Sequence, residues 1–73
     1  MEYVIVIYPE ERDVFVDGQQ VGKTNQTLQI ETGHHTFSLG EPPDYTPPSQ
    51  TVAVTDTNPI IPMEIVFTPL GGA

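Results

Sequence analysis

The hydrophobic and polar positions of this chain alternate in short runs, which is the pattern of β-strands. Turn-forming residues rich in glycine separate the runs, and this punctuation is typical of tight hairpins. The runs are residues 14–16, 27–31 and 35–39, and the separating residues are Asp17-Gly18, Gly22-Lys23-Thr24 and Thr32-Gly33. The rhythm predicts an all-β domain, with structural turns at Asp17, Gly18, Gly22 and Gly33.

The phase of the alternation predicts which side chains face the core. Successive side chains of a strand point to opposite faces, so every second residue is expected inside. Inward positions are expected at Val14, Val16, Leu28, Ile30, Val52 and Val54, and shared faces at His35, Phe37 and Leu39 and at Met63, Ile65 and Phe67. Phe15 is expected to point the opposite way from its two neighbours.

The first run, residues 2–8, is apolar on both faces. One face carries Tyr3, Ile5 and Ile7, and the other carries Val4, Val6 and Tyr8. In so small a domain one apolar face of this strand is short of cover, and docking or strand addition would supply it. The expected interaction surface is Val4, Val6, Tyr8, Phe15 and Tyr45. The alternative, that the last strand and the proline loop cover this strand fully, stays open. Tyr45 could form an aromatic platform with Tyr8 and Phe15, but we favour the alternative that it folds back and caps the sandwich.

The segment 40–49 is irregular because it holds four prolines, which fix the backbone and remove amide donors. Strand patterns resume at 50–55 and 63–68, with a turn at 56–59 between them. No segment has the pattern of a helix of useful length. These features predict a small antiparallel β-sandwich of the immunoglobulin or prealbumin-like type, with about six or seven short strands. We expect one domain over residues 1–70 and a flexible tail at 71–73.

Composition narrows the possible functions. The 73 residues carry a formal net charge of −8, with Arg12 and Lys23 as the basic residues and no cysteine. Nucleic-acid binding depends largely on Lys and Arg, so neither DNA nor RNA nor an anionic membrane is an expected partner. No apolar run approaches the ~20 residues of a membrane span. The N-terminus lacks the pattern of a signal peptide, so the chain is expected to be made without one or to be a mature or excised fragment.

Three short motifs suggest chemistry but are better explained by structure. Gly22-Lys23-Thr24 resembles the end of a phosphate-binding loop, yet Asp17 stands where that motif needs glycine and no helix follows. His34 and His35 are adjacent on a strand and point to opposite faces, so they are poorly placed to bind one metal ion. The acidic residues between 10 and 17 lack the spacing of a calcium loop. We therefore expect no cofactor, no metal and no enzyme activity.

The chain resembles a PEGA domain over about residues 2–70. The resemblance rests on combined motifs: Pro9-Glu10, Val14-Phe15-Val16-Asp17-Gly18, Val21-Gly22-Lys23-Thr24, Leu28-x-Ile30 with Gly33-x-His35-x-Phe37, and Tyr45. Four residues depart from the family pattern. Glu11 and Arg12 replace the namesake Gly and Ala, Asn25 stands where Pro is usual, and Asp44 where Gly is usual. These departures are expected to change local turns rather than the fold.

The resemblance implies a small β-sandwich of bacterial or archaeal envelope proteins, which favours an extracytoplasmic location. It also implies an interaction role with a protein or a surface polymer. We therefore expect a non-catalytic interaction or structural module that binds another protein or domain, as a monomer or with weak self-association. The alternative is a carbohydrate-binding module, which would require exposed and roughly coplanar rings among Tyr8, Phe15 and Tyr45.

Overall fold

Short β-branched and aromatic runs form the strands of this protein. The computed structural model describes residues 1–70, and these contain no helix, hence none that could cross a membrane. The strands are β1 (Glu2–Ile7), β2 (Asp13–Val16), β3 (Gln19–Lys23), β4 (Thr27–Ile30), β5 (Gly33–Ser38), β6 (Tyr45–Thr46), β7 (Gln50–Val54), β8 (Met63–Val66) and β9 (Thr68–Pro69). The predicted tail at 71–73 lies outside the described residues.

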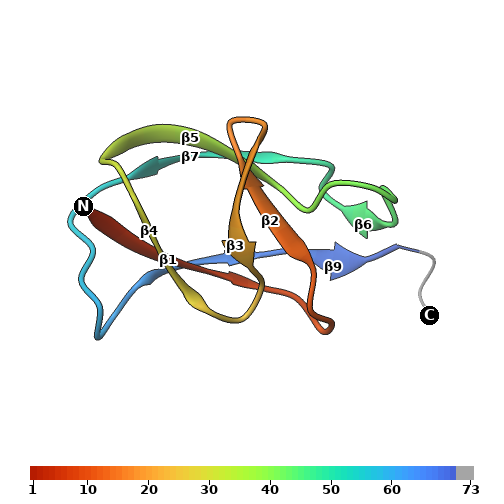
Figure 1. Ribbon diagram of the computed structural model, residues 1–73, viewed down its shortest axis with the longest axis horizontal. Coiled ribbons are helices and arrows are strands. Elements are labelled where there is room, and N and C mark those ends of the chain that lie inside the picture. Colours follow the sequence, from red (N-terminus) through yellow and green to blue (C-terminus); the bar gives the residue numbers. More distant parts are fainter. Residues whose placement is uncertain (71–73) are drawn as a thin grey trace.

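The strands form a β-sandwich, which confirms the predicted fold class. One sheet has the order β4-β1-β8, the second has the order β3-β2-β5-β7, and β6 pairs with β9 (Figure 1). β1 is antiparallel to β4 but parallel to β8. The alternation pattern did not predict this parallel pair, because it specifies faces and not strand direction.

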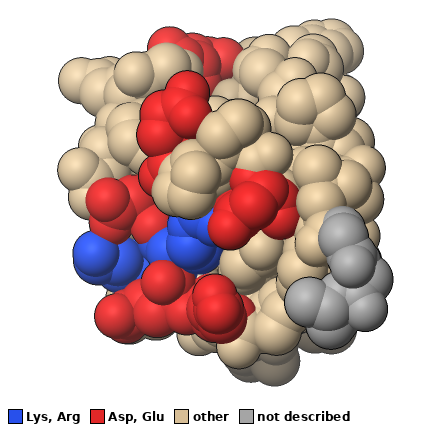
Figure 2. Space-filling view, turned by 90° about the vertical axis from the view of Figure 1, so that its right-hand side faces the viewer, with Lys and Arg blue, Asp and Glu red and all other residues tan. Residues whose placement is uncertain are grey.

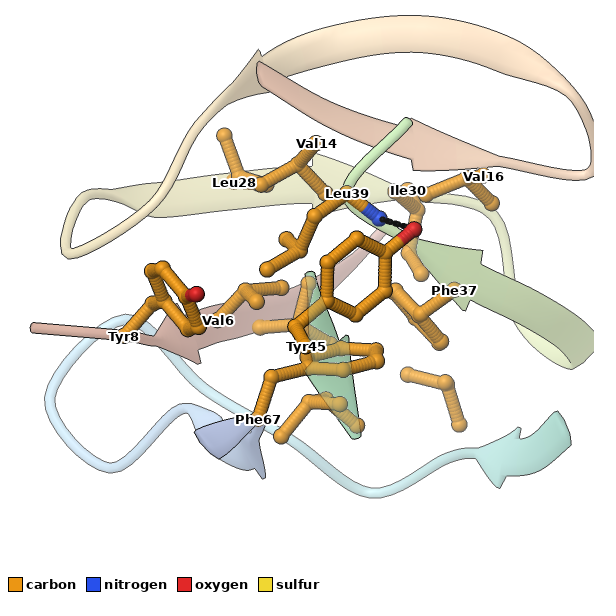
Figure 3. Close-up of a cluster of buried hydrophobic side chains, with 13 residues drawn as sticks. Val6, Tyr8, Val14, Val16, Leu28, Ile30, Phe37, Leu39, Tyr45 and Phe67 are labelled. Atoms are coloured by element: carbon orange, nitrogen blue, oxygen red, sulfur yellow. Dashed lines mark hydrogen bonds between the residues drawn. The ribbon is translucent and has the colours of Figure 1, made fainter. Parts of the chain in front are cut away.

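The core lies between the two sheets and contains the side chains whose phase predicted burial. Figure 3 shows aliphatic side chains from both sheets meeting around Tyr45 and Phe67. The buried hydrophobic residues are Val4, Val6, Tyr8, Val14, Val16, Leu28, Ile30, Phe37, Leu39, Tyr45, Val54, Ile65 and Phe67, with Val52 and Met63 packed against them. The predicted core is thereby confirmed.

The hairpin between β2 and β3 turns at Asp17-Gly18. Both residues have positive φ, 54° and 82°, as a two-residue hairpin turn of the I′ type requires. Gly33, the first residue of β5, also has positive φ, 136°, where the predicted turn leads into the strand. The prediction for Gly22 was wrong. Gly22 lies inside β3, where the pairing with β2 shifts register, and it is not among the glycines with positive φ.

The proline segment folds back and closes one end of the sandwich. Within it Tyr45 and Thr46 form β6, which pairs with Pro69 and Thr68 of β9. The Tyr45 hydroxyl accepts a hydrogen bond from the backbone N–H of Leu39 (3.1 Å) and donates one to the carbonyl of Gly40 (3.0 Å). The sequence pattern predicted a loop here and missed the strand pair, which is two residues long on each side.

Candidate functional site

The predicted interaction surface is wrong for four of its five residues. Val4, Val6, Tyr8 and Tyr45 are buried core residues. Phe15 is half-buried and its ring packs on Gly40, where an added Cβ would lie only 2.5 Å from the ring. The face of β1 that bears Val4 and Val6 is inside because the second sheet and the proline segment cover it. The alternative that the sequence left open is correct for the proline segment but wrong for the last strand, since β8 pairs with β1 in the same sheet.

The aromatic platform needed for carbohydrate stacking is also absent from the described residues. Tyr8 and Tyr45 meet edge to face, with ring centroids 6.5 Å apart and planes at 84°. Tyr45 and Phe67 meet in the same way, at 5.6 Å and 87°. Buried perpendicular rings stabilise a core and present no flat stacking surface to a sugar. The carbohydrate hypothesis loses the observation that it required.

The opposite face of β1 remains partly uncovered, and we call it the outer face. It consists of Tyr3, Ile5 and Ile7, which are half-buried, and the neighbouring Val66 of β8, which is 52% exposed. The register brings these side chains together, because Ile7 pairs directly with Val66 and Ile5 with Glu64. Strand alternation therefore places an apolar row on the solvent side of the three-stranded sheet.

The most exposed apolar residues lie in the loop that leads into β8. Ile60 is 88% exposed and Ile61 is 73% exposed, and we call this pair the isoleucine tip. Pro59 and Pro62 flank it. The side-chain oxygen of Asn58 accepts hydrogen bonds from the backbone N–H groups of both isoleucines, at 2.9 and 2.8 Å. The tip is thus an ordered turn, which projects at the lower left of Figure 1.

A network around Glu2 fixes the base of this loop to β1. The Glu2 carboxylate accepts hydrogen bonds from the Thr32 hydroxyl (2.6 Å) and from the hydroxyl and backbone N–H of Thr57 (2.6 and 2.9 Å). Thr57 in turn accepts a hydrogen bond from the N–H of Tyr3. The donors, Thr32 first and then Thr57, lower the pKa of Glu2 to about 2, since they favour the charged carboxylate. The hydrogen bonds of Thr57 to β1 therefore fix the position of the loop that carries the isoleucine tip.

The opposite end of the molecule carries both basic residues, and both are paired. Figure 2 shows Lys and Arg there among Asp and Glu side chains. Arg12 binds Asp44 at 2.7 Å, and Lys23 binds Asp13 at 2.6 Å. With its two cations paired to its own carboxylates, the chain presents a mostly acidic surface to a partner.

Arg12 is a structural residue that sequence analysis missed. Its guanidinium group lies over the rings of Tyr8 and Tyr45, 5.8 and 5.4 Å from their centroids, and donates to the carbonyl of Pro42 at 2.9 Å. The hydrogen bond to Asp44 raises the pKa of Arg12 further. These contacts tie the β1–β2 connection to the proline segment. The sequence feature that could have indicated this role is that Arg12 is one of two basic residues and is surrounded by acidic residues in the chain.

The histidine pair does not converge on one site. His34 is exposed, whereas the His35 ring contacts the Asp17 carboxylate and the Glu31 carbonyl, both at 2.7 Å. The hydrogen bond to Asp17 raises the pKa of His35. His35 is therefore held by one carboxylate and one backbone carbonyl, and its ring has a structural role. Within residues 1–70 no group of three His, Asp or Glu residues is arranged to hold a metal ion.

The Gly22-Lys23-Thr24 motif has a structural explanation. An added Cβ at Gly22 would overlap the end of the Leu28 side chain, which would have to shift to admit it. The buried Thr24 hydroxyl accepts from the N–H of Arg12 (2.9 Å) and donates to the carbonyl of Glu10 (2.8 Å). The motif thus holds the β1–β2 connection and has no loop that cradles a phosphate.

Asn25 explains one departure from the resemblance noted above. Its φ is +62°, a value closed to proline, and its side chain pairs with both backbone groups of Tyr8, at 3.2 and 2.8 Å.

The sequence model of the PEGA domain family matches residues 1–68. No curated protein and no solved structure gave a match.

Proposed function

The chain belongs to the PEGA domain family, and from this premise we propose that it is a non-catalytic interaction module of the cell envelope that docks onto another protein. The observation that carries the proposal is the isoleucine tip. Two adjacent isoleucines are 88% and 73% exposed on a turn that hydrogen bonds hold in place. Such a rigid apolar projection has no role in the core of its own domain.

Protein docking explains the tip in energetic terms. Full burial of one isoleucine side chain is worth roughly 1.5–3 kcal/mol, and a preorganised turn loses little entropy on binding. Interface anchors of this kind fill pockets on the partner. The isoleucine tip leads into β8, and β8 lies in the same sheet as the outer face of β1. The apolar row on the outer face would therefore extend the contact beyond the tip.

The charge of the chain favours a partner with a basic surface. The formal net charge is −8, and the two basic side chains are both paired internally. Complementary charge speeds encounter and excludes acidic competitors. An extracytoplasmic location and a non-catalytic role both agree with family membership.

Site-specific photo-cross-linking tests the proposal. A photoreactive amino acid replaces Ile61 or Val66, and a matched variant carries it at Ala53, which is exposed on β7 of the other sheet. In envelope extracts of the cells that make the protein, positions 61 and 66 should give a discrete cross-linked product that position 53 does not give.

Competition separates docking from chance contact. Unlabelled wild-type chain should suppress the product, and the triple variant Ile60→Ser, Ile61→Ser, Val66→Ser should not suppress it. Equal yields at positions 53, 61 and 66, or suppression by the triple variant, would refute docking through this surface.

A further inference from the structure

A second surface, separate from the isoleucine tip, lies between the edges of β3 and β4. It is a shallow groove with a volume of about 270 Å³. Its lining includes Met1, Val16, Val21, Ile30, Asp17 and Glu31. We call it the edge groove.

Both strands that border the edge groove are edge strands. β3 ends the four-stranded sheet and β4 ends the three-stranded sheet, so each has one side without a strand partner. An exposed strand edge offers backbone N–H and C=O groups to an incoming extended segment. The groove therefore combines a depression with backbone groups on both of its walls.

The chemistry of the edge groove is apolar at the base and acidic at the rim. Val16 and Ile30 are buried beneath it, and Val21 is 41% exposed on its wall. Asp17 and Glu31 supply carboxylates at the rim, and neither Lys nor Arg belongs to the lining. His35 also lines the groove, where its ring contacts the Asp17 carboxylate and the Glu31 backbone carbonyl, so the Glu31 carboxylate is the rim anion that the ring does not engage.

From this arrangement we propose that the edge groove binds an extended, basic segment of a partner protein, which lies along the free edges of β3 and β4 and places an apolar side chain over Val16 and Ile30. Alternation in the segment would send apolar residues to the groove and Lys or Arg to the rim. A second copy of this chain is a poorer occupant, since each copy carries a formal charge of −8.

A titration of the ¹⁵N-labelled full chain with a blocked hexapeptide of alternating arginine and valine tests this inference by NMR. Changes in amide chemical shift should be confined to β3, β4 and the two turns that flank the groove, at Asp17-Gly18 and Glu31-Thr32. A peptide with glutamate in place of arginine should bind at least about tenfold more weakly, and added salt should weaken binding of the arginine peptide.

Matched variants test each component of the groove. Val21→Ser should weaken binding about tenfold because it removes apolar contact, whereas Val66→Ser, a similarly exposed valine on the outer face, should leave it unchanged. Glu31→Gln should weaken binding roughly two- to fivefold, whereas Glu64→Gln removes the same charge elsewhere and should have no effect.

Three outcomes would overturn the inference. Shifts that follow every acidic residue, or equal losses with Glu31→Gln and Glu64→Gln, would mean diffuse charge attraction. Shifts of the groove amides on concentration without peptide would mean that a second copy occupies the groove. Absence of shifts would mean that no basic segment binds. None of these results bears on the isoleucine tip, which cross-linking at positions 61 and 66 tests independently.

Discussion

At the scale of single residues, the few charged side chains that are partly buried act as connectors. The Arg12 side chain is 14% exposed and joins segments that are about thirty positions apart in sequence, through Asp44, Pro42 and two aromatic rings. Local patterns contain no information on such distant contacts. For this reason the sequence predicted the longer strands and the turn at Asp17 but neither the β6–β9 pair nor the role of Arg12.

The substitution Arg12→Lys should destabilise the protein by about 1–2 kcal/mol, because lysine keeps the charge but loses the planar fork that reaches the Asp44 carboxylate and the Pro42 carbonyl together. Urea unfolding at neutral pH measures the change. Lys23→Gln is the matched control: its ion pair with Asp13 is exposed, so the change should be clearly smaller than that of Arg12→Lys. Equal effects of the two variants would contradict the connector role.

The contact between His35 and Asp17 makes stability depend on pH. The pKa of His35 is raised above its ordinary value of 6.5, so its contribution is complete below that pH and is lost as pH rises through the folded-state pKa. The pKa of Asp17 is lowered from 3.8, so its contribution is present above that pH and is lost as pH falls through the folded-state pKa. The pair therefore stabilises the fold most between about pH 4 and 6.5.

The free energy of unfolding should consequently fall between pH 6 and pH 8 in the wild type, and this decrease should shrink in His35→Gln. The variant His34→Gln provides the control, since His34 is exposed on the same strand. Urea unfolding across this pH range decides the matter. A decrease of the same size in His35→Gln and the wild type would disprove the linkage.

At the scale of secondary-structure elements, alternation predicted nearly all inward positions, because a strand of period two against a core leaves little choice of face. It failed for β1, where Val4 and Val6 on one side and Ile5 and Ile7 on the other are equally apolar. Which face is buried depends on where the second sheet packs, and the position of that sheet is a property of the tertiary structure that the strand's own sequence does not specify. The interaction surface was consequently assigned to the wrong side of the strand.

The close approach of the Leu28 side chain of β4 to Gly22 of β3 explains why glycine occupies position 22. An added Cβ there would overlap Leu28 Cδ2, and because that atom ends a flexible side chain that can shift, Gly22→Ala should cost about 1 kcal/mol through overpacking. The double variant Gly22→Ala, Leu28→Val should recover part of this loss, because valine lacks the clashing atom. Urea unfolding of the two single variants and the double variant gives the coupling. Strict additivity would place the origin of the cost elsewhere.

At the scale of the whole molecule, core and surface divide the apolar residues into two groups with different purposes. The core group lies between the sheets, with Phe37, Phe67 and Val54 almost fully buried. The second group comprises the isoleucine tip and the outer face, which stay apolar although solvent reaches them. The sequence predicted the first group because folding itself requires it. Under the proposed docking role, the second group serves contacts with another protein, and the internal periodicity of the chain does not encode such contacts.

This division predicts that the isoleucine tip contributes little to stability. Because Ile60 and Ile61 are 88% and 73% exposed, Ile60→Ser with Ile61→Ser should change the free energy of unfolding by no more than about 0.5 kcal/mol per site. Phe37→Ala, which removes a fully buried ring, should cost about 3–5 kcal/mol. Urea unfolding provides both values, and binding of an apolar dye should fall in the tip variant alone. If the tip variant loses stability on the scale of Phe37→Ala, the isoleucines belong to the fold, and their exposure would cease to indicate a partner.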